Sequence, residues 1–366
     1  MRVLVVNAGS SSLKVSLVGA DGEEVVNHEL KASAGRFKNS NLKTAVAAME
    51  GVDAVGHRVV HGGPRYTSSV RIDARVVAYR HSIADLAPLH MPAAITAIMA
   101  VRKLLPRIPA AACFDTSFHS TIPASAATYA IPERWRRRYG IKRYGFHGFS
   151  HAYAARRVSD LLSVPQADLR IVTCHLGSGA SLAAVSGGRS VDTTMGFTPL
   201  EGLVMATRSG SIDPGVILWL QRHERMTEHQ LTEALDGRSG LLGLAGTEDM
   251  REVLDRRAAG DEEAELAFDV YIHRLRACTA SMASAMNGLD ALVFTGGVGE
   301  NSAVVRAEAA AGLRFLGIEI DAETNAAIKG DGDVSSRQAL VRTLVVHARE
   351  DVEVARDVRR LFAERP

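Results

Sequence analysis

The sequence contains three glycine-rich segments that directly follow apolar runs. In VVNAGSSSLK, residues 5–14, Asn7 ends the apolar run and Lys14 supplies a single cation. CHLGSGAS at 174–181 and FTGGVGENS at 294–302 have a similar arrangement. Turns of this kind point backbone N–H groups into one concavity, which suits phosphate oxygens; for any one segment alone, an ordinary hairpin turn is the alternative. Three together favour a nucleotide site.

Four charged or polar side chains lie in contexts typical of an active site. Asp115 follows the apolar run AAACF, and strand ends are where α/β proteins place reactive residues, although a helix cap or turn is the alternative. Arg58 lies between two histidines in GHRVVHGG, and His147 lies in RYGFHGFSH. Arg208 lies in the turn RSG, where a fixed guanidinium can clamp an anion. These residue types indicate chemistry on phosphate or carboxylate groups.

Composition narrows the function classes. The chain has 366 residues, a formal net charge of +2 and 46% hydrophobic residues, which favours two globular domains and argues against bulk binding of nucleic acid or a membrane surface. The basic cluster at 133–144 is interpreted as a solvated face or a funnel for an anionic substrate, with a nucleic-acid patch least favoured. Cys113, Cys174 and Cys278 lack zinc spacing and indicate reduced thiols in a cytoplasmic protein.

Common cofactor and membrane motifs are absent from the sequence. It has no GxxxxGK[ST] P-loop, no HExxH and no dinucleotide GxGxxG followed by a βαβ unit. The apolar run at the N-terminus is too short for a signal-peptide core, and no apolar run approaches the roughly 20 residues that cross a bilayer.

The elements that must position these residues follow from hydrophobic periodicity. We expect strands at 2–7, 13–18 and 25–30, a helix at 41–50, a strand within 54–63, a helix through 83–105 broken by Pro88 and Pro92, and a strand ending at Phe114. Residues 172–185 resemble the first hairpin, which predicts an internal duplication. The last predicted element is an amphipathic helix at 351–362, with an apolar face of Val354, Ala355, Val358, Leu361 and Phe362.

The motifs occur in the order typical of one family. VNAGSSSLK, GHRVVHGG, FDTSFH, RYGFHGFSH, CHLGSGAS, VDTTMGFTPLEGLVMATRSG and FTGGVGENS span nearly the whole chain, and the block around MGFTPLEGL is highly specific. The chain resembles the acetate kinases, in the superfamily of sugar kinases, heat-shock chaperone ATPases and actin. The resemblance implies an α/β fold of two duplicated ribonuclease-H-like (βββαβαβα) domains around an interdomain cleft. The implied domains are an N-terminal one, 1–117 plus about 350–366, and a C-terminal one, 118–349, for nucleotide binding and dimerisation.

The resemblance also implies the activity. The expected reaction is reversible phosphoryl transfer from ATP to acetate, giving acetyl phosphate and ADP, with Mg²⁺ or alternatively Mn²⁺, in a cytoplasmic homodimer that binds neither nucleic acid nor membrane. Two alternatives remain open: a propionate kinase or broader short-chain acyl kinase, and a non-catalytic ATP-binding regulator. The presence of Arg58, Asp115, His147 and Arg208 argues against the regulator.

Individual roles carry over from the matching motifs. Asp115, His147 and Arg208 are the expected catalytic residues; because an acetate oxygen is already nucleophilic, we expect Asp115 to orient Mg²⁺ or Arg58 rather than to remove a proton. Asn7 and Glu350 are expected to hold the metal, although Glu350 also suits a helix N-terminus. The expected acyl site comprises Arg58, Val60, Leu89, His90, Phe146 and Pro199. The expected nucleotide site comprises Lys14, His175, Leu176, Gly177, Ser178, Gly179, Asp249, Met250, Arg251, Gly297, Val298, Gly299, Glu300 and Asn301.

The chain departs from the family pattern in several places. It is shorter between the first hairpin and GHRVVHGG. Ser178 replaces an asparagine in the second glycine segment, Ser211 replaces an aspartate after RSG, Met91 replaces an asparagine and Arg349 also differs. The shorter side chain of Ser178 leaves the nucleotide preference open, and the apolar stretch at 278–286 suits either a dimer interface or the core.

Overall fold

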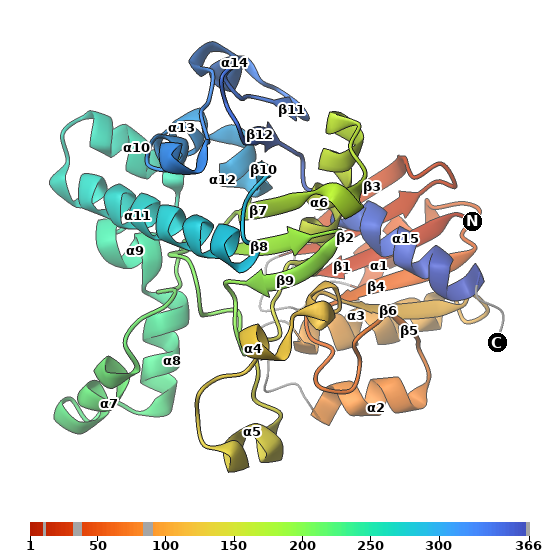
Figure 1. Cartoon of the computed structure of the whole chain (residues 1–366). Helices are drawn as coiled ribbons and strands as arrows, with labels where there is room; N and C mark the ends of the chain where they lie inside the picture. Colours follow the sequence, from red (N-terminus) through yellow and green to blue (C-terminus); the bar gives the residue numbers. More distant parts are fainter. Residues whose placement is uncertain (10–11, 32–38, 83–90, 364–366) are drawn as a thin grey trace. The chain divides into compact units, whose positions relative to one another are not determined.

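Two compact units make up the chain. The computed structural model describes residues 1–9, 12–31, 39–82 and 91–363. Unit one comprises Met1–Ser120, Phe146–Tyr153 and Arg349–Pro366, and unit two comprises Thr121–Gly145 and Ala154–Ala348 (Figure 1). Each unit has its own six-stranded sheet. The expectation of two α/β domains is confirmed.

The sheet of unit one has the order β3-β2-β1-β4-β6-β5. Its strands are β1 (Val3–Ala8), β2 (Ser12–Val18), β3 (Glu24–Lys31), β4 (Ala54–Val59), β5 (Val70–Arg71) and β6 (Ala110–Phe114). β2 is antiparallel to both β1 and β3, whereas β1, β4 and β6 are parallel. The carboxyl ends of the three parallel strands therefore meet at one edge of the sheet.

Alternation along β1 gives the sheet of unit one two buried faces. Leu4 and Val6 belong to a core with apolar side chains of helices α1 (Asn39–Ala47) and α3 (Met91–Leu104). Val3 and Val5 belong to a second core with Val354, Ala355 and Val358 of helix α15 (Glu350–Ala363), which lies across the strands in Figure 1. The amphipathic final helix expected from the sequence is confirmed, because these side chains are buried.

Unit two repeats this topology strand for strand. Its sheet has the order β11-β12-β10-β7-β8-β9. The strands are β7 (Arg170–Leu176), β8 (Ala180–Ser186), β9 (Arg189–Thr193), β10 (Ala291–Thr295), β11 (Gly332–Asp333) and β12 (Arg342–Val345). β8 is antiparallel to β7 and β9, and β7, β10 and β12 are parallel. Asn7 lies opposite Arg58 in the first sheet, just as His175 lies opposite Thr295 in the second, so the predicted duplication is confirmed.

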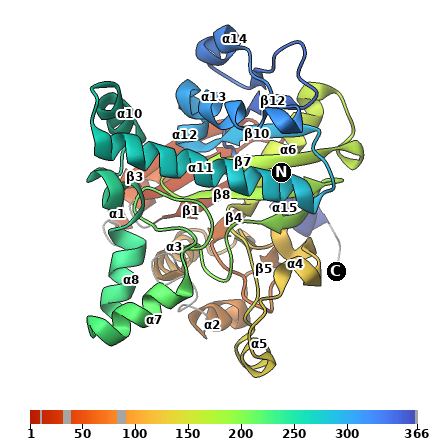
Figure 2. The same cartoon turned by 60° about the vertical axis from the view of Figure 1, so that its left-hand side comes forward.

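Twelve further α-helices are present in the described part of the chain, and α11 is the longest of them. They are α2 (Ala74–Ser82), α4 (Ala124–Ala127), α5 (Glu133–Tyr139), α6 (Gly148–Leu162), α7 (Pro214–His223), α8 (Glu228–Gly237), α9 (Gly240–Ala245), α10 (Met250–Ala258), α11 (Glu262–Ala285), α12 (Gly296–Asn301), α13 (Ala303–Ala311) and α14 (Ala322–Ala327). The long helix α11 packs on β7 and β8 (Figure 2). It buries Met282 and Ala283, so the apolar stretch at 278–286 contributes to the core.

One predicted element begins differently from the expectation. Part of the helix expected over 83–105, including Pro88, lies outside the described residues. The described part, α3, begins at Met91 and has Pro92 in its first turn. A proline needs no N–H partner there, so Pro92 starts this helix instead of breaking it. No helix in the described part of the chain is long and apolar enough to cross a membrane.

Candidate functional site

Arg58 is the centre of a charged cluster in unit one. Its Nε donates to Asp115 Oδ1 at 3.0 Å, and its Nη2 bonds the other oxygen of the same carboxylate. Its Nη1 donates to Asn7 Oδ1 at 3.1 Å, and its Nε lies 3.3 Å from Glu350 Oε2. One guanidinium is thus shared by two carboxylates and one amide.

The fold explains why residues so distant in sequence meet here. Asn7 lies in β1, Arg58 lies opposite it in β4, and Asp115 directly follows β6, at the shared edge of three parallel strands. Glu350 arrives from far along the chain as the first residue of α15, and Asn7 Nδ2 donates to its Oε2 at 3.3 Å. The packing of α15 on the sheet therefore completes the cluster.

Burial and the neighbouring charges shift the ionisation of the cluster. Burial lowers the pKa of Arg58, but the carboxylates of Asp115 and Glu350 outweigh this and raise it overall, so the guanidinium stays charged. Burial raises the pKa of Asp115 to about 6; Glu350 adds to the shift and Arg58 opposes it. Asp115 is therefore ionised at neutral pH.

The cluster offers oxygen ligands to a metal ion. In the part of the chain that the structure describes, no group of three or more His, Cys, Asp or Glu side chains is placed to hold a metal. Asn7, Asp115 and Glu350 nevertheless present one amide and two carboxylate groups around Arg58. Mg²⁺ is typically held by only one or two carboxylates together with water and substrate phosphates, so this donor set fits it.

His147 lies beside the same carboxylate. Its backbone N–H donates to the side chain of Asp115, and its φ is 55°, a left-handed conformation that is uncommon for a non-glycine residue. Gly148 follows in direct contact with the backbone of Asp115, because a Cβ at this position would lie 2.0 Å from the carbonyl oxygen. The loop therefore packs tightly against the residue that pairs with Arg58.

In the described part of unit one, the other predicted residues take no part in the hydrogen bonds and ion pairs of Arg58 given above. Val60 and Phe146 are buried, and the Phe146 ring lies edge-on to His61 at 5.5 Å. Leu89 and His90 lie outside the described residues. Lys14 lies opposite Asn7 in the β1–β2 pair, and its exposed ammonium is 3.9 Å from Glu29.

Unit two contains a pocket of about 600 Å³. The predicted nucleotide residues that line it are Gly177, Ser178, Asp249, Met250, Arg251, Gly297, Val298 and Asn301. Its lining residues that we did not predict are Ala206, Leu241, Glu248, Leu254, Tyr271 and Ser302. His175, Leu176, Gly179, Gly299 and Glu300 are not among the lining residues. Ala206 and Ser302 lie within the quoted motifs and could have been named from them. Leu241, Leu254 and Tyr271 have no such signal and reach the pocket through tertiary packing.

The wall of this pocket formed by GGVGEN is a helix, whereas we expected a turn. Gly296 begins α12 with a φ of 78°, and a Cβ there would lie 2.8 Å from the carbonyl oxygen of Leu176. Only glycine allows this close approach to the end of β7. The Glu300 carboxylate accepts hydrogen bonds from the backbone of Gly296 and Ala348, and buried Arg306 donates to the Glu300 carbonyl. These contacts fix α12 beside the pocket.

Arg208 is held in unit two by backbone oxygen. Its Nη1 donates to the carbonyl of Pro199 at 3.2 Å, and burial lowers the pKa of the guanidinium. Gly210 closes the turn with a φ of 70°, and a Cβ there would lie 2.3 Å from the Leu203 carbonyl. Among the described residues, Pro199 is the only one whose oxygen accepts a hydrogen bond from Arg208. Its Nη1 also contacts Met205 Sδ at 3.6 Å, and the carboxylate of Asp236 is a neighbouring negative charge.

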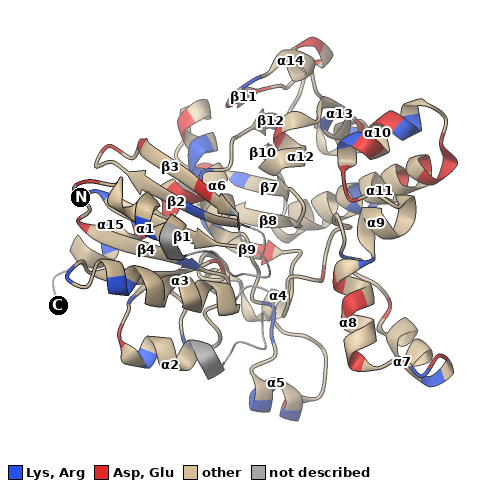
Figure 3. Ribbon diagram, turned by 180° about the vertical axis from the view of Figure 1, so that it is seen from behind, with Lys and Arg blue, Asp and Glu red and all other residues tan. Residues whose placement is uncertain are grey.

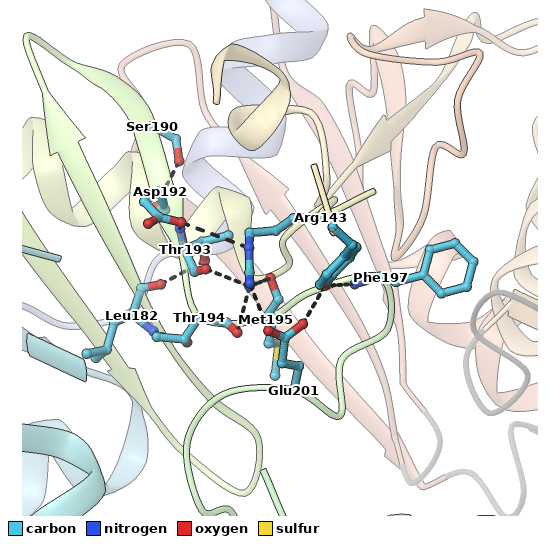
Figure 4. A network of polar contacts seen from close by, with 10 residues as sticks. Arg143, Leu182, Ser190, Asp192, Thr193, Thr194, Met195, Phe197 and Glu201 are labelled. Atoms are coloured by element: carbon cyan, nitrogen blue, oxygen red, sulfur yellow. Dashed lines mark hydrogen bonds and ion pairs between the residues drawn. The ribbon is translucent and has the colours of Figure 1, made fainter. Parts of the chain in front are cut away.

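A second arginine of the sequence motifs has a structural role that the sequence did not indicate. Arg143 belongs to the basic cluster at 133–144, but its Nη1 donates to the carbonyls of Thr193 and Thr194 and its Nη2 donates to Glu201 at 2.7 Å (Figure 4). The Tyr129 hydroxyl bonds the same Glu201 carboxylate. This network fixes the loop that carries Pro199.

The part of the basic cluster that lies on helix α5 is exposed to solvent. Helix α5 buries no residue, and Arg137 pairs with Glu133 one turn away, with both side chains mostly exposed. Figure 3 shows lysine and arginine colouring on this helix. Of the interpretations left open, the solvated face describes α5 best.

Comparison with known proteins places the chain in a family. The model of the acetokinase family matches residues 24–356. The acetate kinase of Shouchella clausii is 40% identical over 391 residues, which covers 98% of this chain and 99% of that protein. The solved acetate kinase of Porphyromonas gingivalis has a TM-score of 0.89 at 34% identity and covers 99% of both chains. A propionate kinase from Francisella tularensis also has a TM-score of 0.89 at 34% identity, covering 97% of this chain and 98% of that one. The chain belongs to the acetokinase family.

Proposed function

We propose that this protein catalyses reversible phosphoryl transfer from ATP to acetate, forming acetyl phosphate and ADP. The observation that carries the proposal is the cluster around Arg58, in which an arginine side chain that is 13% exposed is held by Asp115, Asn7 and Glu350. Family membership and the pocket of unit two support the same activity.

Arg58 binds the carboxylate of acetate. A guanidinium has five N–H donors, and the contacts with Asp115 and Asn7 use three of them. The remaining donors match the two oxygens of a carboxylate. Asp115 holds the planar guanidinium in one orientation, so the bound carboxylate is oriented as well.

The pocket of unit two binds the nucleotide. Its volume of about 600 Å³ lies within the usual range for small-molecule sites. Gly177 and Gly297 bring backbone close to the ligand, and no atom lies within 4 Å of the position a Cβ would take at Gly297. Asp249 and Arg251 pair with each other at the rim, with 2.6 Å between Oδ2 and Nη2.

The transfer step needs positioning and positive charge more than acid–base chemistry. An oxygen of ionised acetate forms a bond to the γ-phosphorus while the bond from that phosphorus to the oxygen it shares with the β-phosphate breaks, which leaves ADP. His147 and Arg208 interact with the oxygens of the transferring group. Asp115 removes no proton in this scheme; it holds Arg58 and the His147 backbone.

Asn7 and Glu350, next to Asp115, would hold Mg²⁺. When bound, the ion neutralises charge on the β- and γ-phosphate oxygens. Mn²⁺ accepts the same oxygen ligands and is the expected substitute.

Acetate is the proposed substrate, and propionate is a slower one. Buried Val60 and Phe146 provide apolar walls for a methyl group in unit one. An apolar pocket discriminates against one further methylene by only about 1–3 kcal/mol. A propionate kinase matches the fold as well as an acetate kinase does, so a broader acyl range is the second candidate function.

We further propose a cytoplasmic homodimer that is joined through α7. This helix buries none of its residues, and Val216, Leu218 and Trp219 are about half exposed or more. Such an apolar helix face is typical of a surface that packs against another protein, and a second copy of this chain is the proposed partner. The free cysteines Cys113 and Cys174 are buried, as expected in a reducing compartment.

The direct test is acetyl phosphate formation with purified protein, ATP, Mg²⁺ and acetate, detected as the hydroxamate. We expect steady turnover with acetate and slower turnover with propionate. Turnover with propionate alone would favour the second candidate. No turnover with any short carboxylate, together with measurable ATP binding, would identify a non-catalytic regulator.

A further inference from the structure

The buried side chain of His119 forms a hydrogen bond with the backbone of Phe146, the residue before His147. It lies in the short helix that follows Asp115, is 3% exposed, and has its Nε2 2.9 Å from the carbonyl oxygen of Phe146. A carbonyl oxygen can only accept a hydrogen bond, so Nε2 must carry the proton. Burial lowers the pKa of His119 to about 4, so the ring is neutral at physiological pH.

His147, which follows Phe146, is held at the N–H end of the peptide group that joins the two residues. The N–H of His147 donates to the carboxylate of Asp115. The peptide unit between Phe146 and His147 is therefore fixed at its carbonyl end by His119 and at its N–H end by Asp115. Both side chains come from one motif, FDTSFH at 114–119.

This fixed peptide sets the direction of the His147 imidazole. The backbone of His147 has a φ of 55°, a left-handed conformation that is uncommon for residues other than glycine. Such a conformation persists where the surrounding structure holds it in place. Rotation of the preceding peptide would relax that conformation and move the ring. Gly148 adds a steric limit, because it lies directly against the backbone of Asp115.

We infer that His119 is a positioning residue that holds His147 in its productive orientation through the carbonyl of Phe146. The inference rests on the proposed action of His147 on the transferring phosphoryl group. In this role His119 does not contact the substrates. The FDTSFH motif thus supplies two residues, Asp115 and His119, that hold the peptide between Phe146 and His147.

Two variants separate the hydrogen bond from simple packing. His119→Phe keeps a ring but removes the donor, whereas His119→Gln keeps an amide N–H at nearly the position of Nε2. We expect His119→Phe to lower kcat about 10- to 100-fold with the KM for ATP within about twofold, and His119→Gln to recover most of the loss. His229→Phe, at an exposed position of α8, is the matched control and should retain wild-type kinetics.

Selective ¹⁵N labelling of histidine provides a readout that does not depend on activity. At pH 7 we expect His119 to be protonated at Nε2 and unprotonated at Nδ1, and to remain so down to about pH 5. A ring protonated at Nδ1, a folded His119→Phe protein with kcat within twofold of wild type, or His119→Gln impaired as much as His119→Phe would each overturn the inference. If His119→Phe does not fold, the labelled wild-type spectrum and the kinetics of His119→Gln decide.

His147→Ala, assayed in parallel, distinguishes this inference from the function on which it rests. An inactive His147→Ala together with a fully active His119→Phe overturns the positioning role alone. A fully active His147→Ala overturns the proposed role of His147 and the inference with it. A wild-type protein that forms no acyl phosphate overturns the proposed function, even if the spectrum shows the expected Nε2 proton.

Discussion

Arg58 and Asp115 form a two-point ion pair at the ends of adjacent parallel strands. Arg58 Nε donates to Asp115 Oδ1 at 3.0 Å and Nη2 bonds Oδ2, with the aspartate side chain only 1% exposed. A two-point pair of this kind fixes the plane of the guanidinium. The arrangement supports a proposed catalytic role for Asp115 that needs no proton transfer.

Asp115→Asn should therefore impair both the orientation of Arg58 and the binding of Mg²⁺. The amide keeps the size of the side chain but loses the carboxylate that bonds Arg58 at two points, so that Glu350 is the remaining charged partner of Arg58. An amide also cannot bond the guanidinium and the His147 N–H with equal strength. We expect kcat to fall by at least about 100-fold and the Mg²⁺ concentration for half-maximal activity to rise. Rates measured over a Mg²⁺ titration check this, and full activity with an unchanged metal requirement would exclude both roles of Asp115.

Val60→Ala should widen the acyl range. Val60 is 6% exposed in unit one, and its truncation makes room for one further methylene. We expect the ratio of kcat/KM for propionate to that for acetate to rise about tenfold. Val185→Ala, in the core of unit two, is the matched control for loss of apolar volume elsewhere. Equal substrate ratios in Val60→Ala and wild type would remove Val60 from the acyl site.

Ser178→Asn should strengthen nucleotide binding. Ser178 lines the pocket of unit two, and its carbonyl accepts a hydrogen bond from the N–H of Ala206, so the backbone is already fixed. The longer amide reaches further into the pocket, and one added hydrogen bond is worth about 1 kcal/mol, or roughly fivefold in affinity. The KM values for ATP and GTP measure the effect. A higher KM for ATP would show that serine suits this pocket better.

Charged substitutions on α7 should dissociate the proposed dimer. Leu218 and Trp219 are 63% and 53% exposed, and an aspartate at both positions would place charges in an apolar interface. We expect the mass from light scattering to fall from dimer to monomer, with unchanged circular dichroism. Arg137→Asp on exposed α5 is the control and should stay dimeric. A monomeric wild-type protein, or a dimeric double variant, would contradict the proposed interface.

Asn7 and Asp115 can be recognised in the sequence at the ends of apolar runs, whereas Arg58 was expected within the strand of 54–63 and is followed by Val59 and Val60. Parallel strands bring their carboxyl ends to one edge, so strand order alone places these residues together. The duplicated hairpin also predicted the topology of the second sheet, since His175 occupies the place of Asn7.

Other features depend on contacts between residues that are far apart in sequence. Glu350 joins Asn7 across 343 positions, and only the packing of α15 brings it there. The sequence around Arg143 does not distinguish it from its exposed neighbours in the basic cluster. Its side chain is held by hydrogen bonds to the backbone carbonyls of residues 193–195, which are distant in sequence. The bond from His119 to Phe146 likewise links two motifs that are separate in the sequence.

The most direct test is a kinetic comparison of wild type with Arg58→Lys, with acetate and ATP varied separately. Lysine keeps the charge but cannot make the two-point contacts of a guanidinium. The account predicts that the KM for acetate rises about 10- to 100-fold while the KM for ATP stays within about twofold, because Arg58 is not among the residues that line the proposed nucleotide pocket. An unchanged KM for acetate, or an equal rise in both KM values, would contradict the role of Arg58 as the carboxylate-binding residue.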